Sequence, residues 1–415
     1  MRHHGQCNIL THHFYPIPLN NSLYCIASVT IKSMAHCLQK RDNVSMAEFV
    51  NPTQPIPPRL AEEMNLIRKM ERCSRSDLHR LMNCRKNTIG QDVNTLIQMG
   101  LMRETELQSL PRGRPSVHLE IDTDTRHVLG VAIMPGMVSC GRYNLLGQPL
   151  EMPTNLTVDD PSQILKATRR LIKQMHDNQT ILTGLSIPGM LDRDHCKVLS
   201  SSTWPDGKSV SLKSLNQLTD SRLIFDNTTN ALGTRWLLEH ANTPLHDHLL
   251  IFLSDGILGA TLLINGHPID GCIICSNELG HTRLPLDTPR CYCGQTGCLE
   301  RIFSTAYLKQ LGENNKLSKA IADAPTSPKI RQITDYLTMG LANAVNFCRP
   351  SHVTIMTDLP DMDDYIDVLV EQIRDQLLRE FANRIQMHKW TEPNAQPAAS
   401  GAALALAQIY WCRPG

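Results

Sequence analysis

The sequence has no excess of charge of either sign. Its 41 Lys and Arg residues balance 40 Asp and Glu residues over 415 positions, which leaves a net charge of +1. This balance excludes a histone-like basic protein and a chain with a long acidic tail. Hydrophobic residues make up 41% and charged residues 20% of the chain, as in ordinary globular proteins. The length predicts two to three domains with at least one large core.

The sequence also lacks long apolar runs. No run approaches the roughly 18 residues that a membrane-spanning helix needs. No secretory signal is recognisable, because the most apolar stretch near the N-terminus, residues 23–34, is broken by Thr30 and Lys32. We therefore expect a cytoplasmic protein without membrane insertion. Cytoplasmic thiols are reduced, so a cluster among the 14 cysteines indicates metal or redox chemistry.

Residues 1–58 carry little periodic signal and are expected to form a poorly structured N-terminal extension. They end in a Pro-rich stretch, residues 51–58, which is typical of an extended, polyproline-like linker. Residues 1–45 differ in composition from the segments that follow. One hypothesis is therefore that the native protein starts at Met46.

The next segment differs from the rest of the chain in charge. Residues 59–118 carry 11 Lys and Arg against 7 Asp and Glu, whereas residues 119–415 carry 26 against 31. A mildly basic segment on a slightly acidic body is what a nucleic-acid-binding module would show. The excess of positive charge in residues 59–118 is modest, so it suggests this role and does not establish it.

Residues 59–122 are predicted to form a winged helix-turn-helix DNA-binding domain. Apolar spacing indicates three short helices, with Ser74 and Asp77 as a capping box before the second and Gly100 at the end of the third. Two strands should follow, at residues 101–107 and 117–121. Three helices and a two-stranded ribbon are the order of a winged helix-turn-helix.

The predicted contacts with a double-stranded DNA operator lie on the third helix and the wing. A recognition helix meets base edges with its first turn, where Arg and Lys suit guanine and Asn and Gln suit adenine. The wing contains Arg-Gly-Arg-Pro, the core of an AT-hook, which can lie in a narrow A·T minor groove. The alternatives are a solvated helix face in a protein-interaction domain and a basic turn. The predicted residues are Arg85, Lys86, Asn87, Thr88, Gln91, Arg112 and Arg114.

Residues 123–415 alternate between strand and helix signals, which predicts an α/β body of two similar halves. A hairpin is expected at residues 138–150 around Gly147. The other expected strands are residues 128–133, 181–187, 223–225, 249–253, 260–264 and 353–357. The expected helices are residues 164–175, a helix ending near His240, 298–311, 328–348, 362–382 and 398–407.

Three cysteines fall within eight residues in this body. Cys291, Cys293 and Cys298 follow His281 by ten to seventeen positions. Three thiolates and one imidazole are the donor set of a structural Zn²⁺ site, and four protein ligands leave no open position for a catalytic water. Gly294 and Gly297 allow the sharp backbone turns that this spacing requires. The alternatives are unrelated thiols or one redox pair.

A second, nearby pair, Cys272 and Cys275, lies in an apolar or loop context. We interpret these two residues as unligated thiols. They are not included in the predicted zinc site.

Glu278-Leu279-Gly280-His281 followed by Cys291-x-Cys293-Gly294-x-x-Gly297-Cys298-x-Glu300 resembles the signature of the ROK family (repressors, open reading frames and sugar kinases). The resemblance covers roughly residues 60–410, including the helix-turn-helix that only the regulator branch carries. It implies a two-lobed, actin-like (ribonuclease H-type) α/β body with a sugar between the lobes. It also implies a structural zinc in the loop 278–300.

The motifs of the family's kinase branch are altered in this sequence. Residues 132–136 lack the acidic residue and paired glycines of the first phosphate loop, and Ser254-Asp255-Gly256 places a carboxylate in the second. The position of the catalytic Asp holds Thr228, which has no basicity near neutral pH. Residues 356–358 replace the Gly-rich adenosine loop. We therefore expect no ATP binding and no enzymatic activity.

The resemblance places sugar or effector contacts at Asn227, Glu278, His281, Glu300 and Gly189. Carboxylates accept hydrogen bonds from vicinal hydroxyls, which suits a neutral or amino sugar. The alternative is a vestigial pocket whose Glu residues only brace the zinc loop.

Together these features predict a DNA-binding transcriptional regulator, usually a repressor, of sugar uptake or metabolism. Its effector would be a sugar, a sugar phosphate or a transport-system protein. Symmetric half-sites require at least a homodimer, and a homotetramer is the other expectation. The alternative functions are a ROK sugar kinase with atypical ATP loops and a non-catalytic, zinc-dependent protein-interaction module.

Overall fold

The structure is a computed structural model. It describes residues 55–70, 73–106, 117–204, 209–240, 247–265, 267–269, 277–391 and 396–411. Four residues singled out by the sequence, Arg112, Arg114, Cys272 and Cys275, lie outside the described residues, as does most of the segment 1–58. Among the helices that are described, none combines the length and the apolar character needed to cross a membrane.

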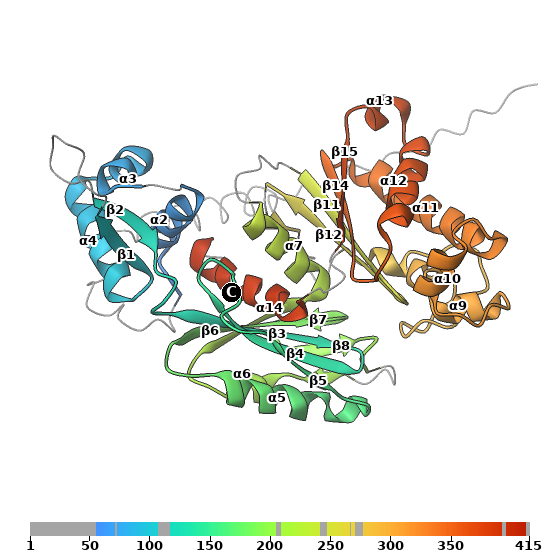
Figure 1. Ribbon diagram of the computed structural model, residues 1–415, viewed down its shortest axis with the longest axis horizontal. Helices are drawn as coiled ribbons and strands as arrows, with labels where there is room; N and C mark the ends of the chain where they lie inside the picture. The colour runs from blue at the N-terminus through green and yellow to red at the C-terminus, as the bar shows by residue number, and fades with distance from the viewer. Residues whose placement is uncertain are drawn as a thin grey trace, which may run out of the picture. The chain divides into compact units, whose positions relative to one another are not determined.

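The first described segment has three helices and a two-stranded antiparallel ribbon, in the order that the sequence predicted (Figure 1). Ser74 and Asp77 form the expected capping box at the start of the second helix, and Asn83 ends that helix in a left-handed conformation. The elements are α2 (Pro58–Lys69), α3 (Arg75–Met82), α4 (Lys86–Gln98), β1 (Met102–Glu106) and β2 (Val117–Ile121).

Two five-stranded sheets with the same strand order form the rest of the chain. Starting from the antiparallel edge, the order is β5-β4-β3-β6-β10 in the first sheet and β13-β12-β11-β14-β15 in the second. In each sheet the first strand in sequence is central, pairs antiparallel with the next strand and pairs parallel on its other side. The expected two similar halves are therefore two copies of one topology.

Each half adds helices and short strands to its sheet. The first half comprises β3 (His127–Met134), β4 (Met137–Asn144), β5 (Thr154–Thr157), η2 (Pro161–Gln163), α5 (Ile164–Met175), β6 (Thr180–Ile187), β7 (Met190–Asp192), β8 (Lys197–Ser200), β9 (Val210–Ser211), α6 (Lys213–Asn216), β10 (Arg222–Asn227) and α7 (Thr228–Glu239). The second half comprises β11 (Asp247–Ser254), β12 (Ile257–Ile264), β13 (His267–Pro268), η3 (Leu279–His281), α8 (Leu299–Ile302), α9 (Thr305–Gln310), α10 (Leu317–Asp323), α11 (Pro328–Cys348), β14 (His352–Thr357), α12 (Asp363–Asp375), α13 (Arg379–Ala382), β15 (Gln386–Thr391) and α14 (Pro397–Tyr410).

The last helix of each half packs on the sheet of the other half. Helix α7 contacts β11 and β12, α14 contacts β3 and β6, and the two helices contact each other (Figure 1). The contact of α14 is close enough to require glycine, since a Cβ on Gly184 would lie 1.9 Å from the carbonyl oxygen of Gly401. This exchange of helices joins the two halves, and at Gly184 the backbone of the sheet packs directly against the backbone of α14.

The hairpin predicted over residues 138–150 is present, since Tyr143 pairs antiparallel with Pro149 across the turn at Gly147, and a further hairpin pairs β3 with β4 around Gly136. Two local predictions differ from the structure. The helix predicted over 298–311 is broken between α8 and α9, where the hydroxyl of Ser304 caps the second piece. The helix predicted over 362–382 ends at Asp375, and a separate short helix follows.

Candidate functional site: a polar cavity beside a metal loop

A cavity of about 490 Å³, part of it open to solvent, lies where residues of the two halves meet. One half contributes the turn after β6 and the start of α7, and the other contributes β11, β12 and the loop that leads to α8. The lining residues are Pro188, Gly189, Ser202, Asn227, Thr228, Thr229, Phe252, Ile257, Leu258, Gly259, Asn277, Glu278, Tyr292 and Glu300. Four of the five predicted effector contacts line it, all except His281.

The turn at Gly189 borders the cavity because the chain approaches its neighbour closely there. Gly189 has a φ of +116°, and a Cβ at this position would lie 2.2 Å from the carbonyl oxygen of Ser200. Only glycine satisfies both conditions without strain.

Helix α7 starts at the cavity wall. The Asn227 side chain caps it, since its Oδ1 accepts a hydrogen bond of 2.8 Å from the backbone N–H of Asn230. The neighbouring carboxylate, Asp226, is buried and accepts two hydrogen bonds of 2.9 Å from Arg193. Thr228 is therefore the first residue of the helix, and its hydroxyl lies 3.5 Å from that of Ser186.

Two carboxyl groups face the cavity from the other half. Glu300 is 4% exposed, and its Oε1 has no hydrogen-bond partner among the described residues. Burial raises the pKa of Glu300 to about 8 and also raises the pKa of Glu278. A buried carboxyl oxygen without a partner is costly, so this wall is suited to a ligand that brings a hydroxyl donor.

Beside this wall, the four predicted metal ligands come together. The ligand atoms of His281, Cys291, Cys293 and Cys298 all lie within 4.8 Å of one another. The Sγ atom of Cys291 is 3.6 Å from His281 Nδ1, and the Sγ atoms of Cys293 and Cys298 are 3.6 Å apart. Zn–S bonds of about 2.3 Å in a tetrahedron place two sulfurs about 3.7 Å apart. The donor set and its spacing therefore fit a tetrahedral metal ion.

The backbone around these ligands turns as the sequence predicted. Gly294 and Gly297 have φ values of +89° and +81°. Burial raises the pKa of the Cys298 thiol to about 11 and raises that of Cys291 further. Because metal ligation requires thiolates, binding must displace these protons, and metal affinity falls as the pH falls.

Tyr292 lies between the metal loop and the cavity. Its hydroxyl is 3.1 Å from His281 Nε2 and donates a 3.5 Å hydrogen bond to Glu300 Oε2. Tyr292 lines the cavity and His281 does not. The sequence did not mark Tyr292, although its place between two metal ligands, Cys291 and Cys293, is the signal that could have done so.

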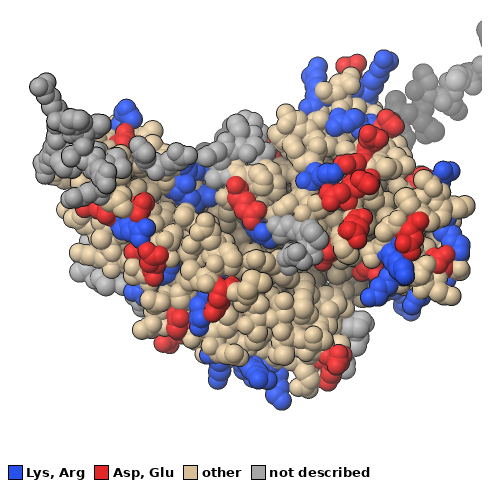
Figure 2. All heavy atoms as spheres, in the orientation of Figure 1, with Lys and Arg blue, Asp and Glu red and all other residues tan. Residues whose placement is uncertain are grey.

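The predicted base-reading residues on α4 are accessible. Arg85, Lys86, Asn87 and Gln91 are exposed and Thr88 is half-buried, whereas Ile89, Val93 and Leu96 on the other side of the helix form the core. The two wing arginines are not among the described residues. On the face drawn in Figure 2, the described Lys and Arg side chains are interspersed with Asp and Glu, so these side chains form no extended patch of one charge sign.

Two arginines on α2 have structural partners that the sequence did not reveal. Arg59 forms a bidentate ion pair with the buried Asp92 of α4, at 2.6 and 2.9 Å. Arg68 donates a 2.8 Å hydrogen bond to the carbonyl oxygen of Leu238 near the end of α7, and its guanidinium lies over the Tyr410 ring of α14. Both partners are distant in sequence, so no local pattern indicates them.

The fold and site thus define a duplicated α/β body with a polar cavity and a metal loop, joined to a winged helix-turn-helix. Residues 147–408, more than half of the chain, match the ROK family, and the protein belongs to that family. All residues of the cavity and the metal loop lie within the matched segment.

Similar proteins include two repressors. The chain is 25% identical over 374 residues to the DNA-binding transcriptional repressor Mlc of Escherichia coli, covering 83% of this chain and 92% of Mlc. It is 27% identical over 319 residues to the xylose repressor of Caldicellulosiruptor bescii, covering 68% of this chain and 78% of that protein.

A solved structure supports the fold. The chain resembles a ROK family transcriptional regulator described as a homologue of the E. coli Mlc protein, with a TM-score of 0.70 and 20% sequence identity. The likeness covers 85% of this chain and 96% of that regulator. It confirms the predicted actin-like ROK body with the N-terminal module.

Proposed function

We propose that this protein is a DNA-binding transcriptional repressor of sugar uptake or metabolism, in which the ROK body senses an effector. The relatives Mlc and the xylose repressor support this reading by their names and by the length over which they match. The exposed polar turn of α4 supports DNA contact, and the polar cavity supports binding of a hydroxyl-rich effector.

The observation that links effector binding to DNA binding is that helix α7 runs from the cavity to the DNA-binding module. Its first residues, Thr228 and Thr229, line the cavity, and the carbonyl oxygen of Leu238 near its end accepts the hydrogen bond from Arg68. The helix has 12 residues, about 18 Å at 1.5 Å per residue, so one element spans the distance between the two places. A ligand that shifts the start of α7 would therefore also shift α2.

The same site argues against phosphoryl transfer. Thr228 cannot accept the proton of a sugar hydroxyl, and Asp226, the carboxylate beside it, is engaged with Arg193. Asp255 occupies the second phosphate-loop position, where its carboxylate accepts a hydrogen bond of 2.6 Å from the backbone N–H of Thr305. Turnover of ATP with any hexose or amino sugar would contradict this conclusion and favour the kinase alternative.

The metal that best suits the loop is Zn²⁺, held by His281, Cys291, Cys293 and Cys298 in a structural role. Four protein ligands complete a tetrahedron, and the ion would fix the loop that carries Tyr292 and leads to Glu300. The effector would then bind against a rigid wall, whether it is a sugar, a sugar phosphate or a docked transport-system protein. A homodimer or homotetramer would match symmetric DNA half-sites.

The DNA-binding part is tested by selecting genomic fragments with the full-length protein. We expect enrichment of a sequence with two related half-sites. Asn87→Ala should weaken binding to that sequence about tenfold or more, the effect of losing one base contact. Gln98→Ala, an exposed change at the other end of α4, is the matched control. Failure to enrich any sequence would favour the alternative of a protein-interaction module.

The coupling through α7 is tested with Arg68→Met. This change keeps an apolar side chain of similar length but removes the guanidinium, and with it the hydrogen bond to Leu238 and the cation–π contact with Tyr410. We expect operator binding to remain and the release of DNA by the effector to weaken, as measured by titrating a panel of sugars and sugar phosphates into the complex. Lys69→Met, an exposed change next to Arg68, is the control, and an unchanged effector response in Arg68→Met would contradict the coupling.

A further inference from the structure

The hydroxyl of Tyr292 occupies a position between two polar groups at the cavity wall. His281 Nε2 is 3.1 Å away on one side, and Glu300 Oε2 is 3.5 Å away on the other. Tyr292 is the residue between Cys291 and Cys293, so the backbone that carries its ring is anchored by two thiols of the metal loop. The ring is therefore held in place by the loop itself.

The hydrogen bonds of this position have a defined direction. His281 Nδ1 faces the thiols, at 3.6 Å from the Sγ of Cys291, and is the nitrogen available to a metal. The other nitrogen, Nε2, then carries the proton and donates it to the Tyr292 oxygen. Tyr292 in turn donates its own proton to Glu300 Oε2. A hydroxyl group that both accepts and donates is what this position requires.

A sugar hydroxyl offers the same combination of acceptor and donor. Tyr292 covers His281, which does not line the cavity, and it engages one oxygen of Glu300. The second oxygen of Glu300, Oε1, is buried and has no partner among the described residues. The carboxyl group could therefore serve two ligand hydroxyls, and Tyr292 leaves it only one.

We propose that Tyr292 is a specificity-determining residue of the cavity, whose hydroxyl takes the place of a ligand hydroxyl between His281 and Glu300. The inference rests on the proposed function, in which the cavity takes a sugar. The described residues of the lining include two carboxyl groups and no Lys or Arg, so the ligand they favour is a neutral monosaccharide without a phosphate. Such a ligand must either bind beside Tyr292 or displace it, and displacement would pull on the chain between two metal ligands.

The proposal is tested with three variants of the full-length protein. Tyr292→Ala removes the ring and the hydroxyl, Tyr292→Phe removes the hydroxyl alone, and Gln295→Ala is a control at an exposed position of the same loop. Calorimetric titration with D-glucose, D-xylose, N-acetylglucosamine and glucose 6-phosphate gives the affinities. Metal content is measured on each preparation.

We expect at least one neutral sugar to bind Tyr292→Ala about tenfold or more tightly than the wild type, the effect of regaining one strong hydrogen bond. Tyr292→Phe should gain less, because the ring still fills the space, and Gln295→Ala should behave as the wild type. Equal or weaker affinity in Tyr292→Ala, including no binding by any sugar, would overturn the proposal. If Tyr292→Ala loses its metal, Tyr292→Phe decides by the same criterion.

Operator binding, measured in parallel with the DNA enriched in the genomic selection, separates this inference from the proposed function. If the variants bind the operator but gain no sugar affinity, the repressor proposal stands and the proposed role of Tyr292 is refuted. If the protein binds no DNA, the repressor proposal is refuted, and the sugar titrations still decide the role of Tyr292.

Discussion

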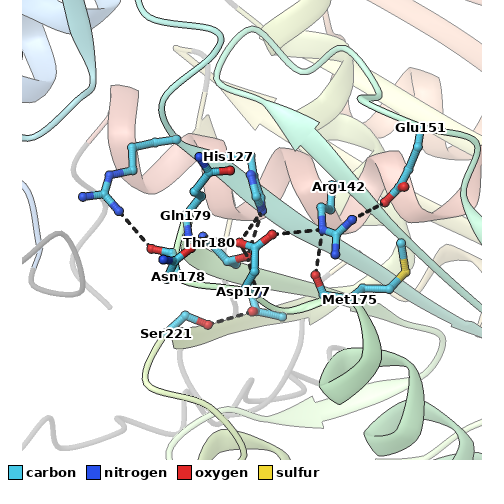
Figure 3. Close-up of polar contacts among 11 residues, drawn as sticks. His127, Arg142, Glu151, Met175, Asp177, Asn178, Gln179, Thr180 and Ser221 are labelled. Carbon is cyan, nitrogen blue, oxygen red and sulfur yellow. Dashed lines mark hydrogen bonds and ion pairs between the residues drawn. The ribbon is translucent and has the colours of Figure 1, made fainter.

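The two halves of the body each bury a histidine near the start of the central strand of the sheet. His127 begins β3 and His248 is the second residue of β11, the corresponding central strand. His127 Nε2 is 2.9 Å from Thr180 Oγ1 (Figure 3), and His248 Nε2 is 2.8 Å from Thr354 Oγ1. Both threonines lie on the neighbouring parallel strand, but Thr180 is the register partner of His127 whereas Thr354 lies two residues beyond His352, the register partner of His248.

The surroundings of the two histidines differ in charge. His127 is 3.1 Å from Asp177, which also faces Arg142 at 3.4 Å (Figure 3). Burial lowers the pKa of His127, and Asp177 acts in the opposite direction. His248 has the imidazoles of His352, His388 and His240 nearby, and burial followed by these groups lowers its pKa to about 3.

The comparison teaches that a repeated strand topology does not repeat the position or the chemistry of its buried side chains. The same distinction holds for the crossing helices, because α14 meets the first sheet at glycine backbone whereas α7 meets the second at a side chain. Among the described residues, the metal cluster occurs in the second half alone. Each difference can be tested with matched changes in the two halves.

Removal of the metal should have the largest effect and should act on the second half. Cys293→Ser is expected to release the metal and to lower the free energy of unfolding by about 4 kcal/mol or more, because metal binding is coupled to folding. Cys348→Ser, a half-buried thiol of the same half outside the cluster, should cost less than about 1 kcal/mol. Metal analysis and urea unfolding measure both. An unchanged melting temperature after chelation would show that the ion is not structural.

The next largest difference should separate the two crossing helices. A Cβ on Gly184 would lie 1.9 Å from backbone of α14, whereas a Cβ on Gly233 of α7 would lie 2.4 Å from the methyl group of Thr261. Backbone cannot move aside as a side chain can. We therefore expect Gly184→Ala to cost about 3 kcal/mol and Gly233→Ala about 1 kcal/mol, since the latter also gains helix propensity. Equal costs in urea unfolding would remove this distinction.

His248 should contribute a loss of stability in acid. Its pKa is about 3 in the folded protein and near 6.5 when unfolded, so the unfolded state binds more protons between these values. The contribution of His248 to stability should be constant above pH 6.5 and fall below it, by up to about 1.4 kcal/mol per pH unit. His248→Gln should reduce the difference in unfolding free energy between pH 7.5 and pH 5 more than His127→Gln does. An unaltered pH dependence in His248→Gln would contradict this assignment.

The smallest difference should come from the two threonines. Thr354→Val leaves His248 without its hydrogen-bond partner, and the other ring nitrogen of His248 already has none among the described residues. Thr180→Val leaves His127 with Asp177 as a partner. We expect costs of about 2 and about 1 kcal/mol, respectively, in urea unfolding. A larger cost for Thr180→Val would show that Asp177 does not compensate.

Much of the fold and one part of the site could be predicted because their signals are local. The capping box at Ser74 and Asp77 involves residues three positions apart, and three metal ligands lie within eight residues. Local geometry therefore brings these groups together wherever the segment lies. The errors also came from local signals, since the helix predicted over residues 298–311 is interrupted before Ser304, which caps a new helix.

The cavity could be predicted only in part. Asn227, Glu278, Glu300 and Gly189 were expected from family resemblance, and the structure places all four in the lining of one cavity. The position of His281 behind Tyr292 was not expected, because it depends on where the ring of Tyr292 points. The contact of Arg68 with Leu238 spans 170 positions, and no periodicity or spacing indicates such a pair.

The sequence by itself determined the order of the elements, the clustering of His281 with three cysteines and the residues at the kinase-motif positions, since each depends on residue type and short spacing. Tertiary structure alone decided that α7 reaches from the cavity to α2 and that the hydroxyl of Tyr292 lies between His281 and Glu300. It also decided that one buried histidine of the body has a carboxylate beside it and the other has imidazoles. Long-range packing sets these contacts, and no short spacing in the sequence indicates them.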